Sequence, residues 1–340
     1  MRGRPGHLPT LRRGSALRIK NVLLVAYCIE RTFVPIAYSE ITILDSVVVS
    51  VEELACLDTL IWLRSGSAAA ARLGVTQSTI SRRVNQIANL FHLRFFKPNG
   101  EWETLGDQTI LNLDRMVHQR YRWEHGMPLR IEAQYFSGPL FCDPSPEGWT
   151  PGNFDFMEIK TPLRLLRTGV IDAWIGTYSD VPDADDQELA CFHLTRLPTH
   201  LVVAVDHPLL ALGERITLDD VRHYPSFALP DHAFPRMQHI LQQLGLWNLQ
   251  VPLRRYSHEK WEGRMTHDLR VGYANAFTLH LFPEPHVVLP IQIPLETGDS
   301  LIVLRRYAEH RRLQALLACL TAKAAQLAEQ FSDLRLVGGA

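Results

Sequence analysis

The chain has 340 residues, of which 46% are hydrophobic, and it carries 35 Lys and Arg against 36 Asp and Glu. This length predicts two or three globular units with cores of their own, and the formal net charge of -1 excludes a chain that is basic as a whole. The five cysteines are far apart and form no CxxC pair, which argues against a disulfide framework or zinc ribbon and favours a reducing cytoplasm, and no apolar run approaches the ~20 residues of a membrane span.

Residues 1–50 are expected to be a flexible basic leader or an over-long start, with the real start near Val48 to Val51. They begin "MRGRPGHLPTLRRGSALRIK", which contains basic residues and no acid. A signal peptide is disfavoured because "VLLVAYCIERTF" runs into charge without a small-residue cleavage site. A basic arm that contacts nucleic-acid phosphates is a third interpretation.

Residues 51–106 are predicted to form three helices and a hairpin. The stretch "VEELACLDTLIWL" has apolar residues at helical spacing. Ser67 is predicted to cap "AAAARL", and Gly74 to end that short helix. Thr76 is predicted to cap a third helix, and the turn "PNG" to join two short strands. This order is that of a winged helix-turn-helix.

Positive charge gathers around this unit. The window 64–100 has no Asp or Glu, and its basic residues are Arg64, Arg72, Arg82, Arg83, Arg94 and Lys97. A local basic surface on a neutral chain indicates phosphate binding. Ile80, Val84 and Ile87 are predicted to pack the third helix inward, which turns its N-terminal half outward toward a major groove, where Gln suits adenine and Arg suits guanine.

The predicted DNA-binding residues are Ser67, Thr76, Gln77, Ser78, Thr79, Ser81, Arg82, Arg83 and Lys97. The alternative is that Ser and Thr only cap the helix and that the arginines are only solvated.

Residues 107–126 are predicted to form a linker helix. Its apolar residues at three- and four-residue steps are Ile110, Leu113, Val117 and Tyr121, with Met116 beside them. Beyond Pro128, strands alternate with helices up to the amphipathic "HRRLQALLACLTAKAAQLAEQF". This alternation predicts an α/β domain with a largely parallel sheet.

Three segments carry a resemblance to a known family. The stretch "AAAARLGVTQSTISRRVNQI…LRFF" resembles the LysR-type transcriptional regulators, and "LLRTGVIDAWIG" and "VAVDHPLL" are similar to segments of their effector domain. The matching positions in the first stretch are Ala69, Ala70, Leu73, Val75, Gln77, Ser81, Arg82, Phe91 to Leu93, and Phe96. The resemblance extends over most of residues 52–325 and implies that Gln77, Ser81 and Arg82 contact DNA.

The resemblance also implies the domain organisation. An α winged helix-turn-helix domain at 51–106 is followed by a linker and dimerisation helix at 107–126, an α/β effector domain at 127–331 and a tail at 332–340. The effector domain would have the two-lobed periplasmic-binding-protein-like (type 2) fold, with lobe I at 129–195 and 297–331 and lobe II at 196–296. The linker helix is shorter than the family's, and Asn275 to Phe277 replace a glycine-rich turn.

A small carboxylate is the expected effector, bound in the crevice at the carboxyl ends of strands. Ser137 and Thr161 lie at predicted helix starts, where backbone N–H groups favour an anion, although ordinary N-caps occupy the same positions. Lys160 adds positive charge there or is a solvated surface group. The candidate effector-binding residues are Phe136, Ser137, Lys160, Thr161, His232 and Phe277, of which the two phenylalanines and the histidine suit an apolar or aromatic body.

Other functional classes fit less well. A periplasmic solute-binding protein shares the fold but predicts an export signal directly before the α/β region. An enzyme is disfavoured because "HEKWEG" (258–263) lacks the second histidine of a zinc helix, and GxSxG and phosphate-loop motifs are absent from the sequence. Cys142 is a weak candidate for an oxidant sensor, and Asp172 is expected to be structural.

We therefore predict a cytoplasmic, non-enzymatic LysR-type regulator without cofactor or metal. Its expected partners are double-stranded DNA, a small-molecule effector and further copies of itself in a homodimer or homotetramer, but no membrane.

Overall fold

The computed structural model describes residues 49–261, 269–282 and 286–337, all within one compact unit, Asp45–Ala340. The predictions for the basic leader up to residue 48 and for the end of the tail at 338–340 lie outside this part of the chain. None of the helices in the described ranges has both the length and the apolarity that a membrane span requires.

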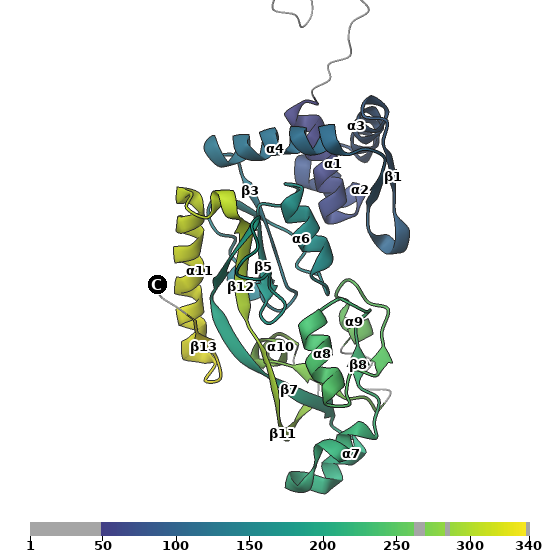
Figure 1. Ribbon diagram of the computed structural model, residues 1–340, viewed down its shortest axis with the longest axis vertical. Coiled ribbons are helices and arrows are strands. Elements are labelled where there is room, and N and C mark those ends of the chain that lie inside the picture. The colour runs from purple at the N-terminus through teal and green to yellow at the C-terminus, as the bar shows by residue number, and fades with distance from the viewer. Residues whose placement is uncertain (1–48, 262–268, 283–285, 338–340) are drawn as a thin grey trace, which may run out of the picture. The chain divides into compact units, whose positions relative to one another are not determined.

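The N-terminal part contains three helices and a hairpin in the predicted order (Figure 1). The helices are α1 (Val51–Leu63), α2 (Gly66–Leu73) and α3 (Gln77–Leu90), and the antiparallel strands are β1 (Arg94–Phe96) and β2 (Glu103–Leu105), joined through the short turn η1 (Pro98–Gly100). As predicted, Ile80, Val84 and Ile87 of α3 are buried. The three helices pack against one another.

The caps of these helices follow local sequence signals, with one correction. Gly74 ends α2 in the left-handed conformation at φ 65°, as predicted. The prediction that Ser67 caps α2 is wrong: the Oγ of Ser65 accepts a hydrogen bond from the backbone N–H of Ala68 at 3.3 Å. Of the two serines in "RSGS", the first already has the extended backbone of an N-cap, which places Ser67 inside the first turn.

Helix α4 (Thr109–Glu124) presents its polar side inward. The side chains of Asp114, Arg115, His118 and Gln119 are buried together with Leu111 and Trp123. Its apolar stripe is exposed instead and consists of Ile110, Leu113, Met116, Val117 and Tyr121. Polar contacts therefore hold α4 to the rest of the protein, while the apolar stripe has no cover within the described chain.

The first sheet has the strand order β4-β3-β5-β12-β6. Its strands are β3 (Leu129–Ala133), β4 (Trp149–Pro151), β5 (Ala173–Thr177), β6 (Leu189–His193) and β12 (Asp299–Leu304). Figure 1 shows α6 (Lys160–Arg167) and the long α11 (Arg311–Gln330) on opposite sides of this sheet, and α5 (Gly138–Phe141) follows β3.

The expectation of a largely parallel sheet is only partly correct. Strand β3 is parallel to β4 and β5, but β12 is antiparallel to both of its neighbours. The reason is the route of the chain, because β12 enters directly from β11 of the second sheet instead of through a crossover helix.

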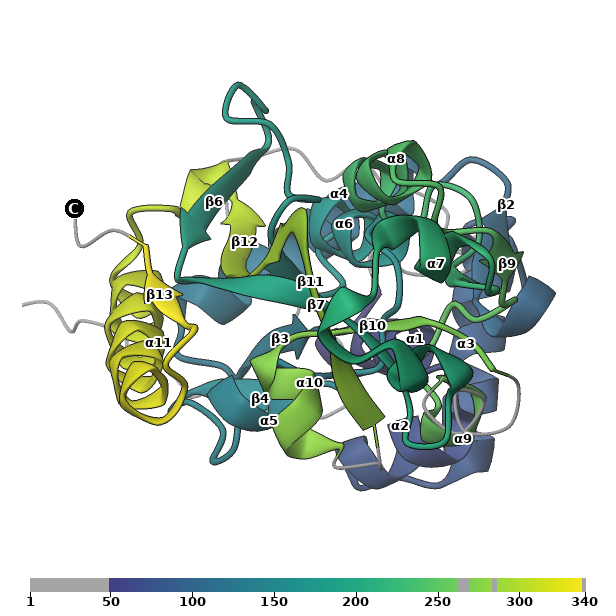
Figure 2. The same ribbon diagram turned by 90° about the horizontal axis from the view of Figure 1, so that it is seen from below.

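The second sheet is built around the long strand β7 (Thr195–Ala204) (Figure 2). Its other strands are β10 (Gly272–Ala274), β11 (His286–Thr297) and β13 (Arg335–Leu336), all antiparallel to β7. The chain enters this sheet directly after β6 and leaves it from β11 into β12 through Gly298. A side chain at Gly298 would lie 2.2 Å from the carbonyl oxygen of Thr195, so only glycine fits where the two connections pass each other.

The remaining elements follow β7, β10 and β12 along the chain. They are the helices η2 (Pro208–Arg215), α7 (Leu218–Arg222), α8 (Pro235–Gln243), α9 (His258–Trp261), α10 (Ala276–Leu281) and η3 (Arg305–Tyr307), and the parallel pair β8 (Phe227–Ala228) and β9 (Leu249–Gln250).

Candidate nucleic-acid interface and small-molecule pocket

The N-terminal half of α3 faces outward. Gln77, Ser78, Ser81 and Arg82 are exposed, and Thr79 is half-buried. The Oγ1 of Thr76 accepts a hydrogen bond from the backbone N–H of Thr79 at 3.2 Å and therefore caps the helix. This helix thus offers amide, hydroxyl and guanidinium groups on one exposed side, while its apolar residues hold it in place.

Most basic groups around α3 are already bound within the chain. Arg83 donates through Nη1 to the carbonyl oxygen of Glu52 at 3.3 Å, and Lys97 donates through Nζ to the carbonyl oxygen of Arg64 at 2.7 Å. Arg72 donates to the carbonyl oxygen of Pro151 at 2.7 Å.

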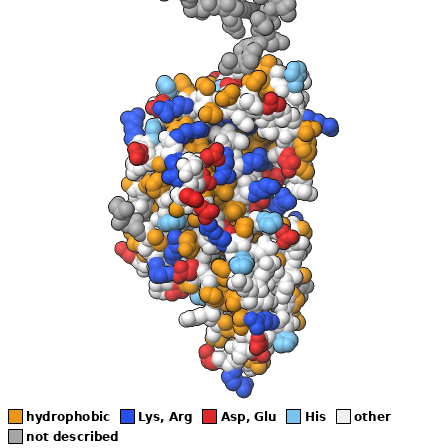
Figure 3. All heavy atoms as spheres, viewed as in Figure 1, with side chains coloured by type: hydrophobic (Ala, Val, Ile, Leu, Met, Phe, Trp, Pro, Cys, Tyr) orange, Lys and Arg blue, Asp and Glu red, His pale blue; other side chains and the backbone are white. Residues whose placement is uncertain are grey.

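The guanidinium groups of Arg82 and Arg94 are the exceptions, since neither makes an ion pair or hydrogen bond with the described residues. On the face that Figure 3 shows, basic and acidic side chains are interspersed. Fewer basic side chains around α3 are therefore free of hydrogen bonds within the protein than the sequence window suggests.

Four charged side chains connect the N-terminal helices and hairpin to the α/β part. We call Arg64, Glu101, Asp155 and Arg255 the junction cluster. Arg255 binds Glu101 through two hydrogen bonds of 2.7 and 2.8 Å and Asp155 through a third of 2.7 Å. Arg64, the C-cap of α1, donates to the other oxygen of Asp155.

A buried carboxyl group lies beside this cluster. Glu132 on β3 accepts hydrogen bonds from the indole Nε1 of Trp62 at 2.7 Å, from the backbone N–H of Phe154 at 2.8 Å and from that of Ala133 at 3.2 Å. Burial, and secondarily the charge of Asp155, raises the pKa of Glu132 to about 7. The bond to Trp62 is a direct link between α1 and the first sheet.

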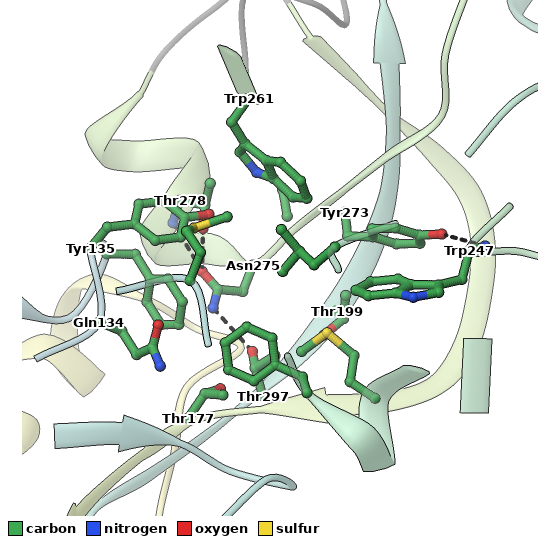
Figure 4. A pocket seen from close by; sticks show the side chains of 16 residues that line it. Gln134, Tyr135, Thr177, Thr199, Trp247, Trp261, Tyr273, Asn275, Thr278 and Thr297 are labelled. Carbon is green, nitrogen blue, oxygen red and sulfur yellow. Dashed lines mark hydrogen bonds between the residues drawn. The ribbon is translucent and has the colours of Figure 1, made fainter. Parts of the chain in front are cut away.

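A pocket lies where the carboxyl ends of β3 and β5 meet the second sheet. The cavity itself has a volume of about 70 Å³, and the space counted out through its mouth is about 560 Å³. Figure 4 shows the 16 lining side chains: Gln134, Tyr135, Phe136, Met157, Thr177, Thr199, Leu229, Phe234, Met237, Trp247, Trp261, Tyr273, Ala274, Asn275, Thr278 and Thr297. They come from both sheets and from the helices beside them.

The polar groups of this pocket fall into two kinds. Asn275 is fully engaged: its Oδ1 accepts from the N–H of Thr278 at 2.9 Å, and its Nδ2 donates to Thr297 at 3.0 Å. Gln134 Nε2, Thr199 Oγ1 and Trp247 Nε1 are buried and have no hydrogen-bond partner in the described chain.

The structure does not bring the six candidate effector residues into one site. Phe136 lines the pocket, whereas Lys160 and Thr161 line a separate polar cleft. His232 is exposed, and Phe277 is buried with its ring 5.1 Å from that of Phe331.

The two hydroxyl groups among these candidates already have partners. Ser137 donates to the carboxylate of Asp299, and Thr161 donates to that of Glu158. Neither hydroxyl caps its helix, so the N-cap interpretation is wrong for both, whereas contact with an effector stays a prediction.

Most of the pocket lining was missed from the sequence. Trp247, Trp261 and Tyr273 belong to separate segments and carry no motif, so only the fold brings them together. Asn275 had a signal, because it stands where the resemblance predicts a glycine-rich turn.

The remaining candidates from the sequence have structural explanations. Burial raises the pKa of the Cys142 thiol to about 12, which suppresses the thiolate that oxidation needs. Asp172 is buried and accepts hydrogen bonds from Gln119 at 3.1 Å and from Arg122 at 3.1 Å, so it anchors α4 as a structural acid. The "HEKWEG" segment extends beyond the described residues after Trp261, and no metal-binding group of His, Cys, Asp or Glu occurs in the described ranges.

One comparison identifies a family, and another shows a shared fold. The family model described as LysR substrate binding domain matches residues 154–325. A full-length OxyR variant from Pseudomonas aeruginosa is similar in structure, with 17% identity, a TM-score of 0.50 and coverage of 80% of this chain and 94% of that chain. A probable transcriptional regulator from the same species has 15% identity, a TM-score of 0.51 and coverage of 80% and 96%. No curated protein matches the sequence.

Proposed function

This chain belongs to the LysR family, and we propose that it is a one-component transcriptional regulator that binds double-stranded DNA under the control of a small-molecule effector. A winged helix-turn-helix at 51–106 would bind DNA, the helix at 107–126 would join two copies, and 127–331 would bind the effector. The effector domain would divide into lobe I, 129–195 and 297–331, and lobe II, 196–296. Such a regulator works in the cytoplasm, and the family is one of regulators, not enzymes.

The observation that supports DNA binding best is the outward side of α3. Gln77, Ser81 and Arg82 are exposed on its N-terminal half, and the guanidinium of Arg82 makes no ion pair or hydrogen bond with the described residues. Arg and Gln are the side chains that read guanine and adenine edges in a major groove. An uncommitted guanidinium at this position is therefore available to a base.

Replacing Arg82 with Ala should weaken binding to the preferred DNA by roughly 1–3 kcal/mol, which is about 5- to 150-fold. The preferred sequence is first selected from a random double-stranded library with the full chain, and affinity is then measured by fluorescence anisotropy at fixed salt.

Arg311→Ala serves as the matched control, because Arg311 is an exposed arginine on α11. An Arg82→Ala protein that binds the selected DNA as tightly as the control would contradict the assignment of α3. Failure of the wild-type chain to enrich any sequence would contradict DNA binding itself.

The exposed stripe of α4 is the proposed contact between two copies. Leu113 and Val117 are 56% and 67% exposed, which is unusual for adjacent apolar residues on one helix face. Leu113→Glu should convert the dimer to monomer at micromolar concentration, because it would bury a carboxylate in an apolar interface. Sedimentation velocity measures the change.

Leu336→Glu is the control for this experiment, since Leu336 is also exposed, at 52%, but lies on β13. A Leu113→Glu protein with the sedimentation coefficient of the control would rule out the α4 stripe as the interface.

A further inference from the structure

The pocket at the ends of β3 and β5 is lined without charge. None of its described lining residues is Asp, Glu, Lys, Arg or His. A carboxylate that leaves water for such a lining would lose its hydration without gaining a counter-charge, and this transfer is strongly unfavourable. The lining therefore selects against ions.

The positions expected to hold an anion carry acids of the protein itself. Ser137 points its hydroxyl at Asp299, which is completely buried, and Thr161 points its hydroxyl at Glu158. An effector carboxylate at either hydroxyl would meet a protein carboxyl group at hydrogen-bond distance. Neither hydroxyl is in the lining of this pocket, so neither offers it an anion site.

Aromatic side chains give the pocket flat walls. The rings of Trp247 and Tyr273 lie 6.0 Å apart with a tilt of 37°, and Tyr135, Phe234 and Trp261 line the same space (Figure 4). Flat aromatic surfaces favour a ring, because stacked and edge-to-face contacts add to the gain from burying apolar area.

Two buried donors in this lining lack an acceptor. They are Gln134 Nε2 and Trp247 Nε1, both without a partner in the described part of the chain. Leaving a buried donor unpaired is unfavourable, and a ligand that supplies an acceptor removes this penalty. Figure 4 shows Gln134 and Trp247 on opposite sides of the pocket, so one ligand oxygen can accept a hydrogen bond from one of these donors and not from both.

We propose that this pocket binds a neutral, ring-containing small molecule that carries a hydrogen-bond-accepting carbonyl oxygen, of the aryl ketone class. The assignment of this ligand as the effector rests on the proposed function. The preference for a neutral hydrogen-bond acceptor over an anion rests on the pocket alone. It makes the proposed function more specific, because a neutral ligand takes the place of the small carboxylate expected from the sequence.

Three probes of nearly equal shape separate the contributions. Acetophenone has the ring and the acceptor, ethylbenzene has the ring without the acceptor, and benzoate has the ring with a charge. Calorimetry on the full chain should show acetophenone binding at least about 10-fold more tightly than benzoate and about 2- to 10-fold more tightly than ethylbenzene, the latter being the range of one hydrogen bond. Benzoate binding most tightly, or no binding by any probe, would overturn the proposal.

Gln134→Leu should remove most of the preference for acetophenone over ethylbenzene while leaving ethylbenzene binding unchanged. Retained ethylbenzene binding shows that the variant is folded with an intact pocket. Gln326→Leu is the matched control, because Gln326 is exposed on α11 and outside the lining. A Gln134→Leu protein that keeps the full preference would show that this amide does not bind the oxygen, and would count against the proposal.

These measurements need no DNA, so the two proposals fail separately. If the chain binds acetophenone but enriches no DNA, the assignment of the pocket stands and the proposal of a DNA-binding regulator is contradicted. If the chain enriches DNA but prefers benzoate, the proposal of a DNA-binding regulator stands and the proposal of a neutral ligand is contradicted.

Discussion

Replacing Arg255 with Met is expected to lower the free energy of unfolding by roughly 3–5 kcal/mol, the usual effect of removing one partner from a buried ion pair. The guanidinium of Arg255 binds both oxygens of Glu101 and one oxygen of Asp155, and only 12% of its side chain is exposed. Without it, two carboxylates would face each other with Arg64 as the remaining partner in the junction cluster.

The pKa of Arg255 supports this expectation. Burial by itself lowers it, but the hydrogen bonds that Arg255 donates to Glu101 and the charges of Asp155 and Glu101 more than offset burial, so that the pKa of Arg255 is raised. Its ring neighbour adds packing, since the guanidinium carbon lies 3.4 Å from the ring centroid of Phe156.

Urea unfolding compares this variant with two others. Arg335→Met removes an exposed pair with Glu296, whose side chains are 63% and 44% exposed, and should change stability by less than about 1 kcal/mol. Arg255→Lys should fall between the two, because lysine keeps the charge but not the paired hydrogen bonds. Equal stability of Arg255→Met and Arg335→Met would show that the junction cluster does not hold the two parts together.

The contacts that hold the N-terminal helices and the lining of the pocket share two short segments of chain. Asp155 belongs to the cluster and Met157, two residues later, lines the pocket. In the same way Glu132 binds Trp62 of α1, and Gln134 lines the pocket. A ligand that moves Gln134 or Met157 therefore acts on segments that hold the N-terminal helices, which gives the proposed regulator a physical route between its two sites.

Features that depend only on residues close together in sequence were predictable. The glycine at 74, the threonine at 76 and the apolar spacing of α3 act within a few residues, and all three have the predicted role. The partners of charged groups were not predictable in this way. Lys97 and Arg83, taken from the sequence as surface cations, bind groups from α1 and its C-cap, and only the tertiary structure determines those contacts.

The pocket shows the same division. The sequence indicated the carboxyl ends of strands, and Phe136 does line a pocket there. The aromatic walls come from segments that are distant in sequence and carry no motif. The hydroxyl of Ser137 donates to Asp299, which is distant in sequence, and the hydroxyl of Thr161 donates to Glu158, three residues earlier. Hydrogen bonds of this kind decide what a site can bind and have no signal in the spacing of residues.

A rise in pH through the neutral range is expected to weaken the fold through Glu132. Its pKa is raised to about 7 from the usual 4.5, so between about pH 4.5 and 7 the folded protein binds more protons than the unfolded chain. The free energy of unfolding must therefore fall as the pH rises through this window. At about 1.4 kcal/mol per pKa unit, the decrease approaches about 3 kcal/mol.

Urea unfolding of the wild type and of Glu132→Gln across this window isolates the effect, because glutamine does not ionise. Asp299, whose pKa burial raises to about 6, titrates in the same direction but is present in both proteins. The difference between the two slopes, and not the stability at one pH, is the relevant measure, since the amide nitrogen cannot accept all the hydrogen bonds that Trp62, Ala133 and Phe154 donate to the carboxyl group.

Parallel stability curves for the two proteins would show that Glu132 does not change its charge in this window. A steeper fall of the free energy of unfolding in the wild type would instead show that Glu132, which accepts the hydrogen bond from Trp62 between α1 and β3, titrates in this window. Because the charge of Arg255 lowers the pKa of Glu132 and the charge of Asp155 raises it, removal of Arg255 should extend the titration window of Glu132 to higher pH. If the window is unchanged in the Arg255→Met protein, the charge of Arg255 does not act on Glu132, and the two groups do not belong to one electrostatic network.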